Sequence, residues 1–282
     1  MNGILVVEKE KDMTSRDVVN KISKILNTKK IGHTGTLDPM ATGVLVLCIG
    51  TSLKLVELLT NHDKEYIAKI KLGIETDTLD ITGNIIKKSN PININEERIK
   101  NVLQNMIGKI KQQVPLYSSV KVNGKKLYQY ARNHEEVTPP ERMVEIYDLQ
   151  LLDNIKNNEF TIKCHVSKGT YIRSLVRDIG YQLGTYATLT ELERTRVGKF
   201  KLESSFKIKD IEEGNYQLLT PLEVLDLPKI KVDKSMEYKI KNGQVLPKFF
   251  KEEMALILNE QGTLIAIYQQ KENNLVKPYR MF

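Results

Sequence analysis

One carboxylate, that of Asp38, has a setting that suits chemistry. It lies in a stretch rich in glycine and threonine, Gly32 to Gly43, which leads into an apolar run, Val44 to Ile49. That run is too short for a helix buried on all sides, so we expect a buried strand. Pro39 restricts Asp38 to an extended backbone, and the glycines permit tight bends and close approach of a ligand. A carboxylate aimed in this way suits a nucleophile or a general base, although an ordinary Asp-Pro turn explains the same spacing.

The order of the residues around Asp38 is more informative than their spacing. The run from Gly32 to Leu45 reads Gly-His-Thr-Gly-Thr-Leu-Asp-Pro-x-Ala-Thr-Gly-Val-Leu. It resembles the catalytic motif of the TruB-type tRNA pseudouridine-55 synthases, in which the aspartate is the essential catalytic residue. The resemblance implies that role for Asp38. It also implies an α/β fold of the α+β type, with a mixed, largely antiparallel sheet flanked by helices.

Tyr66 begins an alternating stretch that predicts a strand with one wet face. Tyr66, Ala68, Ile70 and Leu72 fall on one side, with Ile67, Lys69 and Lys71 on the other. Aromatic residues in strands usually pack into a core, and a stacking surface for a base is the alternative. Lys64 to Tyr66 is similar to the family's Lys-x-Tyr segment, whose tyrosine stacks on the target uracil. The resemblance implies that role for Tyr66.

Arg173 lies where an alternating strand, Phe160 to Val166, turns into a predicted amphipathic helix. An arginine in the first turn gains nothing from the helix dipole, so a specific carboxylate partner is one interpretation. A surface arginine that meets Asp178 or solvent is the more usual case. Gly169 to Arg173 is similar to the family's Gly-Thr-Tyr-Ile-Arg motif. The resemblance implies that Arg173 pairs with Asp38 and that Tyr171 lines the pocket.

Four further residues receive roles from the resemblance. Leu192 lies in a match to Leu-Arg-Arg-Thr-Arg-Val-Gly-x-Phe and would contact the base. His33 would fill the space that a flipped base leaves, unless it is a plain loop histidine. Asp80 has a supporting role in Gly73 to Gly83, where turn hydrogen bonds explain the acidic and hydroxyl residues better than a metal does. Lys9 has a supporting role as the first residue of a motif near the start of the chain, Lys9 to Ser15.

The sequence departs from the family pattern at four positions. The early motif usually reads Lys-Pro-x-Gly-x-Thr-Ser, but here Glu10 and Asp12 replace its proline and glycine. Thr188 replaces a usual histidine, and Glu193 a usual arginine. These positions bear on RNA contacts and do not alter Asp38 or the residues expected around it.

Helices are predicted at several amphipathic segments. Ser15 would cap a helix that ends near Asn27, and Ser52 would cap another with Leu55, Leu58 and Leu59 facing inward. Asn95 to Ile107 forms a third, which Gly108 ends. Thr220 to Glu223 has the pattern of a capped helix start.

The segment from Lys109 to Arg132 carries six basic residues, no acidic residue and three tyrosines. Such a mixture suits either a nucleic acid surface or an ordinary solvated face above core tyrosines. The resemblance implies an RNA-clamping segment, about residues 109–140, that closes on the T stem-loop. We place a domain boundary at Leu227-Pro228, giving a synthase domain, 1–228, and a small PUA-like RNA-binding domain, 229–282. Short strands, Ala255 to Leu258 and Thr263 to Tyr268, make the second domain β-rich, and a plain extension of the sheet is the alternative.

Composition limits the function classes. The chain of 282 residues has a formal charge of +8, which favours a polyanionic partner. No apolar run is long enough to span a membrane, so we expect a cytoplasmic protein with no membrane association. Cys48 and Cys164 lie in apolar or alternating runs and are expected to be buried, reduced thiols.

The implied reaction converts uridine to pseudouridine after the base is flipped into a pocket. Asp38 would either attack C1′ or remove the 2′ proton. The reaction needs no cofactor or metal, and the sequence has no Walker, GxGxxG or cysteine-histidine metal motif. The expected partner is the T stem-loop of tRNA, bound by a monomer without an obligatory protein partner. The rival functions are a non-catalytic RNA-binding or tRNA-folding protein, an N-glycoside hydrolase that releases uracil, and a guide-RNA-dependent relative.

Overall fold

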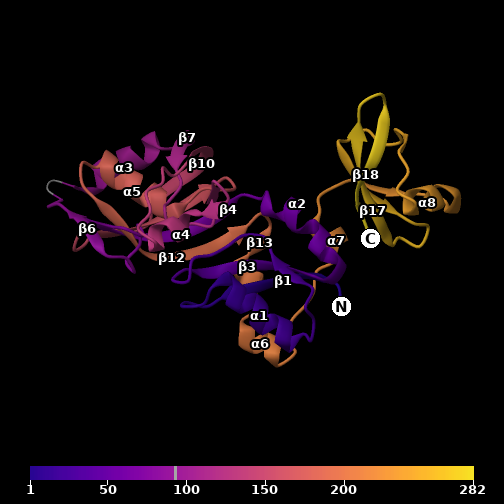
Figure 1. Cartoon of the computed structure of the whole chain (residues 1–282), viewed down its shortest axis with the longest axis horizontal. Coiled ribbons are helices and arrows are strands. Elements are labelled where there is room, and N and C mark those ends of the chain that lie inside the picture. The colour runs from indigo at the N-terminus through magenta and orange to yellow at the C-terminus, as the bar shows by residue number, and fades with distance from the viewer. Residues whose placement is uncertain (92–93) are drawn as a thin grey trace.

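The computed structural model describes residues 1–91 and 94–282. A large region is built on a nine-stranded sheet, and a small β-rich region lies at one end of it (Figure 1). The strands of the large sheet are β1 (Gly3–Lys9), β2 (Ile31–His33), β3 (Thr42–Ile49), β4 (Lys64–Leu72), β7 (Gly108–Gln113), β10 (Glu141–Leu151), β11 (Glu159–Val166), β12 (Ala187–Val197) and β13 (Phe200–Lys201).

Helices and hairpins connect these strands. The helices of this region are α1 (Ser15–Ile25), the 3₁₀ helix η1 (Gly50–Leu55), α2 (Val56–Thr60), α3 (Glu96–Asn105), α4 (Leu127–Arg132), α5 (Ile172–Gln182), the 3₁₀ helix η2 (Leu202–Ser204), α6 (Ile208–Glu212) and α7 (Pro221–Val224). The two hairpins are β5 (Ile74–Thr76) with β6 (Ile85–Lys88), and β8 (Lys121–Val122) with β9 (Lys125–Lys126).

The large sheet has the spatial order β1-β3-β12-β4-β11-β10-β7, with β2 beside β3 and β13 beside β12. Among the described residues its pairings are antiparallel, apart from a short parallel contact between β3 and β12. The predicted fold class, mixed and largely antiparallel with flanking helices, is therefore confirmed.

Strand β3 is buried on both faces, which explains its unbroken apolar sequence. Leu45, Leu47 and Ile49 pack against α1 and α6. The alternate residues Val44 and Val46 pack against η1, α2 and two strands of the small region. The buried strand predicted at 44–49 is confirmed, and it forms a rigid base for the loop that carries Asp38.

The neighbouring strands β4 and β11 have one buried face and one wet face, as the alternation predicts. Helices α3 and α5 cover the buried face, which includes Ala68 and Ile162. The other face carries ion pairs such as that of Lys163 with Glu65. Cys48 and Cys164 are both buried and free, and burial raises the pKa of each thiol to about 12.

The contact between β3 and β12 depends on one glycine. Gly43 has φ +100°, and a side chain there would overlap the backbone of Arg194 on β12. Only glycine tolerates both this positive φ and the lack of space for a side chain. This narrow contact joins the β1–β3 half of the sheet to the β12–β7 half.

Two predicted helix caps are wrong. The first helix is capped by Thr14, which forms a capping box with Asp17, whereas Ser15 is buried and its Oγ accepts a hydrogen bond from the Leu37 amide at 2.8 Å. Ser52 lies inside η1 and caps nothing, because the chain tightens into a 3₁₀ turn before α2 begins. By contrast, Asn95 caps α3, and Thr220 caps α7 through its box with Glu223.

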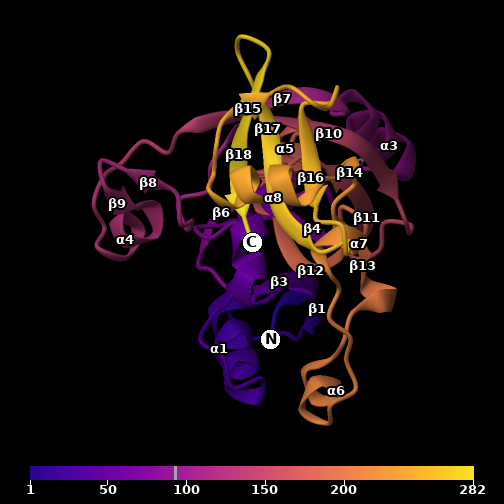
Figure 2. The ribbon, with the colours of Figure 1, turned by 90° about the vertical axis from the view of Figure 1, so that its right-hand side faces the viewer.

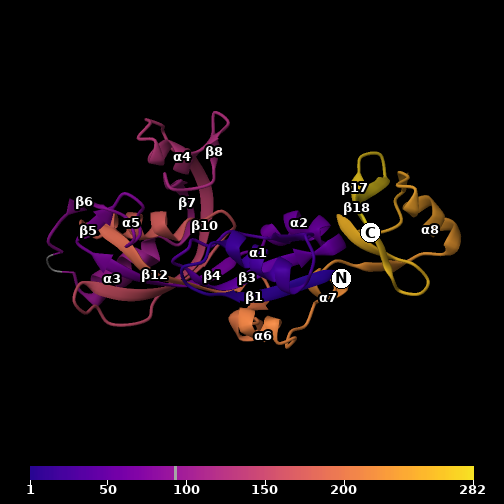
Figure 3. The same ribbon diagram turned by 60° about the horizontal axis from the view of Figure 1, so that its bottom comes forward.

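Residues 114–140 form an arm that stands away from the sheet between β7 and β10, with β8, β9 and α4 at its tip (Figure 3). The small region lies at the far end of the molecule from the β5–β6 hairpin (Figures 1 and 3), and Figure 2 views the molecule from the end at which the small region lies. Its strands are β14 (Lys229–Lys231), β15 (Leu246–Pro247), β16 (Met254–Leu258), β17 (Leu264–Lys271) and β18 (Leu275–Met281), and its helix is α8 (Lys234–Lys241).

The small region has a core of its own, and its strands β16, β17 and β18 contact the large region. The Arg280 guanidinium donates to the carbonyl of Lys54 at 3.0 Å and pairs with Glu57. Among the described residues, no helix has the length and apolar character that crossing a membrane requires.

Candidate active site

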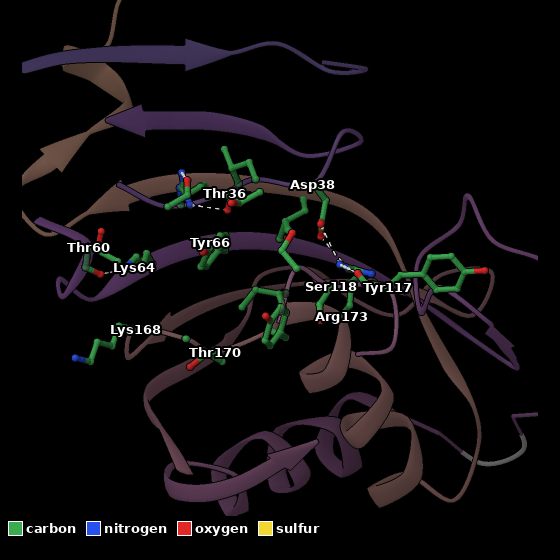
Figure 4. Close-up of a pocket in the computed structure, with 18 of the residues that line it drawn as sticks. Thr36, Asp38, Thr60, Lys64, Tyr66, Tyr117, Ser118, Lys168, Thr170 and Arg173 are labelled. Carbon is green, nitrogen blue, oxygen red and sulfur yellow. Dashed lines mark hydrogen bonds and ion pairs between the residues drawn. The ribbon is translucent and has the colours of Figure 1, made fainter. Parts of the chain in front are cut away.

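A cavity of about 520 Å³ opens beside the join between the two halves of the sheet (Figure 4). Its walls come from the loop 34–38, β4, the arm base 117–119, the turn into α5, and β12. Five residues expected at the site line it together: Asp38, Tyr66, Tyr171, Arg173 and Leu192. The fold thus gathers side chains that lie far apart in the sequence.

Asp38 and Arg173 form a bidentate ion pair. Arg173 Nε lies 2.8 Å from Asp38 Oδ2, and Arg173 Nη2 lies 3.0 Å from Asp38 Oδ1. Two other N–H groups of Arg173 donate to the carbonyls of Thr78 at 2.9 Å and Tyr117 at 3.0 Å. The Arg173 side chain is 5% exposed and that of Asp38 is 33% exposed. A buried guanidinium with four of its five N–H groups engaged therefore holds a carboxylate that still reaches the cavity.

Asp80 is a second carboxylate beside Arg173, with its Oδ2 3.8 Å from Arg173 Nε. Its Oδ1 accepts hydrogen bonds from the Thr78 hydroxyl at 2.9 Å and the Thr82 amide at 3.0 Å. These local bonds confirm the interpretation of this segment as a hydrogen-bonded turn. In the described part of the chain, no cluster of three or more potential metal ligands is present.

The sequence left two environments open for Arg173, a specific carboxylate partner or a surface position near Asp178, and the two arginines of α5 distinguish them. Arg177 forms a half-buried pair with its neighbour Asp178 at 2.8 Å, as an arginine with a local partner does. Arg173, one turn earlier, instead crosses to Asp38. The first turn of α5 thus faces the cavity.

The loop that carries Asp38 is held from below by Lys9. This residue is fully buried, and its Nζ donates to the carbonyls of Glu10 at 2.8 Å, Pro39 at 3.1 Å and Ala41 at 2.6 Å. Burial lowers the pKa of Lys9 to about 8, and nearby Asp12 and Asp38 oppose that shift. The ammonium replaces the solvent that these carbonyls would otherwise need.

Asp12 shows how the sequence tolerates losing the family's usual glycine. Its backbone has φ +64°, the left-handed conformation that glycine adopts most readily. Its amide donates to the carbonyl of Pro39 at 2.8 Å. The turn and its contact with the Asp38 loop are therefore kept despite the substitution.

The two tyrosines lie on different walls. Tyr66 is 7% exposed and belongs both to the core cluster and to the cavity lining. Burial raises the pKa of its hydroxyl and nearby Arg194 opposes the rise, so the phenol is neutral. The backbone of Tyr171 is clamped by buried Gln112, whose Oε1 accepts from the Tyr171 amide at 2.8 Å and whose Nε2 donates to the Tyr171 carbonyl at 3.2 Å.

Arg194, which is not among the predicted site residues, also lines the cavity. It is 2% exposed and donates to the carbonyls of Val44 at 2.7 Å, Gly35 at 3.1 Å and Thr36 at 3.3 Å. It ties the Asp38 loop to β12. The sequence pattern could have predicted this position, because strand alternation places Arg194 on the same face as Leu192.

Two other departures from the family pattern, Thr188 and Glu193, lie away from the Asp38–Arg173 pair. Thr188 is buried and its hydroxyl donates to the carbonyl of Ile74 at 2.9 Å. Glu193 lines a separate cavity of about 260 Å³ rather than the large one.

His33 ends β2 next to the cavity wall but is not among the residues that line the cavity. Within the described residues its buried Nδ1 has no hydrogen-bond partner. Burial, followed by the charges of Arg16 and Arg194, lowers its pKa, so the imidazole is neutral at neutral pH. Its role in filling the space of a flipped base stays a prediction.

Comparison with known proteins gives consistent matches. The model of the TruB family pseudouridylate synthase N-terminal domain matches residues 23–172, and that of the tRNA pseudouridylate synthase B C-terminal domain matches residues 173–225. The tRNA pseudouridine synthase B of Listeria welshimeri is 44% identical, covering 100% of this chain and 98% of its own length. That of Fusobacterium nucleatum is 43% identical, with both chains fully covered.

Solved structures share the fold. A Cbf5-Nop10-Gar1 complex contains a chain with a TM-score of 0.71 and 27% identity, covering 96% of this chain and 79% of that one. An H/ACA RNP bound to a substrate RNA containing 2′-deoxyuridine contains another similar chain, with a TM-score of 0.72 and 24% identity. The match covers 99% of this chain and 84% of that one.

Proposed function

Because the chain belongs to the TruB family of pseudouridylate synthases and is a tRNA pseudouridine synthase, we propose that it acts on uridine 55 of the T loop through Asp38. The observation that carries the proposal is the bidentate pair of Asp38 with the buried Arg173 at the cavity wall. RNA binding alone gains nothing from a carboxylate held in this way. An aimed anion is, however, what a reaction at the sugar requires.

In the proposed reaction, the N1–C1′ bond of the uridine breaks, the uracil turns over in the cavity, and a C5–C1′ bond forms. The proton on C5 leaves and N1 gains a proton, so the product is an isomer of the substrate and no electrons are exchanged. Asp38 acts at the sugar, by attack on C1′ or by removal of the 2′ proton. Both routes need the carboxylate ionised, and the Arg173 guanidinium holds it by two charge-assisted hydrogen bonds.

The other residues position the base. A base in the T loop must be flipped to reach Asp38. Tyr66 provides a ring on which the uracil stacks, Leu192 closes one side and Tyr171 lines another. Asp80 helps to hold Arg173, Lys9 supports the Asp38 loop, and His33 fills the space that the base leaves.

The proposed partner is the T stem-loop of tRNA, bound by a monomer without helper proteins. The segment of residues 109–140, which includes the arm, would clamp the RNA, and the domain of residues 229–282 would add a second contact. Tyr128 has Lys126 and Arg132 over its ring at 5.6 and 5.3 Å, which gives the arm a cationic aromatic surface. The solved complexes contain partner proteins, so the test below uses bare RNA.

The test is release of tritium from a T-arm stem-loop labelled at C5 of its uridines, with pure protein. We expect release at position 55 by the wild type. Asp38→Asn should lose at least about 10³-fold in rate while RNA affinity stays within about threefold, because an isosteric amide keeps the shape and removes the anion.

Three results would contradict the proposal. Free uracil in the supernatant would indicate a hydrolase. Tight binding without tritium release would indicate a binding protein, and release that requires added proteins would indicate a guide-dependent enzyme.

A further inference from the structure

The cavity has a second charged wall that the proposed chemistry does not use. Lys64 and Lys168 lie across the cavity from Asp38, as Figure 4 shows, and Arg142 also lines the cavity. Among residues 1–91 and 94–282, none of these three cations forms an ion pair with a carboxylate. We call them the cationic wall.

Arg142 is the cation of this wall with the most free donors. It lies on β10 opposite Gln112 of β7, which also clamps the backbone of Tyr171. Its guanidinium carbon lies 5.4 Å from the centre of the Tyr171 ring, and within the described chain its side chain donates no hydrogen bond. By contrast, the guanidinium groups of Arg173 and Arg194 are engaged by carboxylate and carbonyl oxygens. Arg142 is therefore oriented by an aromatic ring while its donors remain available.

Gly169 leaves room for this arginine. Its φ of +80° is one that side chains rarely adopt, and a Cβ there would lie 3.2 Å from Nη1 of Arg142. The glycine thus permits both the turn before α5 and the position of the guanidinium above it.

The two lysines extend the wall. Lys168 donates to Oδ1 of Asn61 at 2.8 Å, and Lys64 donates to the carbonyls of Thr60 and His62. Burial lowers the pKa of Lys64 to about 8, and the charges of Arg194 and Lys168 act in the same direction. Asp63 is the adjacent carboxylate, but it already binds His165 and Arg196. An anion at this wall of the cavity would therefore meet cations that no carboxylate of the described residues neutralises.

We propose that Arg142, with Lys168 and Lys64, binds a phosphodiester group next to the flipped uridine and so adds to the affinity for the RNA. This inference rests on the proposed function, because it takes the RNA backbone as the source of the phosphate. A planar guanidinium with free donors can bind two phosphate oxygens at once, and the lysines add charge from the other side. Phosphate contacts of this kind set the position of a nucleic acid rather than its sequence specificity.

The experiment compares wild type, Arg142→Gln, Arg142→Lys and the control Lys100→Gln. Lys100 lies on α3, is exposed and pairs with Glu96, so its substitution removes one charge far from the cavity. RNA affinity across a salt series and tritium release at saturating RNA are measured on the same samples. The T-arm is supplied unmodified or with one neutral methylphosphonate, 5′ or 3′ of the target uridine.

We expect Arg142→Gln to weaken binding about tenfold and to reduce the slope of log affinity against log salt by about 0.7. The rate at saturating RNA should change by less than about threefold. Arg142→Lys should restore the slope, and Lys100→Gln should behave as the wild type. With the methylphosphonate at one of the two positions, wild type and Arg142→Gln should bind equally.

Two results would overturn the proposal: equal effects of Arg142→Gln and Lys100→Gln, or a loss from Arg142→Gln that neither methylphosphonate abolishes. The second result would mean that Arg142 acts on Tyr171 or on a free phosphate ligand. If the wild type binds RNA but releases no tritium, the proposed function fails, whereas the salt slope still decides whether Arg142 contacts a phosphate.

Discussion

The two charged walls of the cavity differ in how their charges are balanced. At the Asp38 wall, each nitrogen of the Arg173 guanidinium has a hydrogen-bond partner, and two carboxylates face this one guanidinium. At the cationic wall, Arg142, Lys64 and Lys168 have no carboxylate partner among the described residues. The first wall is complete before any ligand arrives, whereas the second is completed by an anion.

This difference matches the needs of two tasks. A group that reacts must be held in one geometry, which a buried bidentate pair achieves. A group that binds a phosphate must keep its donors free until the phosphate arrives. Substitutions at the first wall should therefore affect the rate, and those at the second should affect affinity and stability.

The largest effect is expected for Arg173→Met. It removes the partner of Asp38 and leaves two carboxylates facing each other, so we expect the rate at saturating RNA to fall by about 10³-fold. The matched control is Arg177→Met on the same helix, which breaks the pair with Asp178 and should retain the rate within about threefold.

Unfolding midpoints separate this effect from a loss of folding. Removing one partner of a buried pair costs about 3–5 kcal/mol, so Arg173→Met is also expected to be less stable. Arg173→Lys, which keeps the charge but not the bidentate geometry, should recover much of the stability and little of the rate. A normal rate in Arg173→Met near neutral pH would remove the pair from the reaction.

A smaller effect at the cationic wall is expected from the titration of Lys64. Its pKa is about 8 in the folded protein and 10.5 when exposed, so the unfolded chain binds more protons between these values. The free energy of unfolding of the wild type should therefore rise with pH from about 8 to 10.5, relative to Lys64→Met. The gain should be on the order of 1–3 kcal/mol.

The measurement is denaturant unfolding of both proteins without RNA at several pH values. The difference between wild type and Lys64→Met cancels titrations that the two proteins share. A difference that stays constant across this range would mean that Lys64 is well solvated.

The sequence predicts the Asp38 wall much better than the cationic wall, for a physical reason. The unbroken apolar run Val44 to Ile49 indicates a strand buried on both faces, and the alternation of Tyr66 to Leu72 indicates a strand buried on one face. The order of residues around Asp38 and Arg173 also matches family motifs. No sequence pattern predicts the role of Arg142, because the freedom of its N–H donors depends on the ring of Tyr171 and the space above Gly169. Contacts between segments far apart in the sequence decide which charges remain unpaired.

The same reason explains the errors in local structure. Ser15 is as good a cap as Thr14 by residue type, but the choice depends on Asp17 three residues after Thr14 and on Leu37, which binds Ser15. Arg194 was readable from strand alternation, yet its three carbonyl partners come from the Asp38 loop and the start of β3.

The smallest expected effect tests how tightly the Asp38 wall is built, through Asp12→Gly. Asp12 holds a left-handed backbone that glycine adopts without strain, and its amide contact with Pro39 would be kept. We expect the free energy of unfolding to rise by about 0.5 kcal/mol, because relief of backbone strain exceeds the greater entropy of glycine in the unfolded chain. Loss of the Asp12 charge near Lys9 acts in the opposite direction and keeps the gain small. The control is Asn27→Gly, at another left-handed residue that follows α1, and denaturant unfolding measures both. Equal gains in the two variants with an unchanged reaction rate would mean that strain at Asp12 is purely local, whereas a rate change confined to Asp12→Gly would show that this turn helps to aim Asp38.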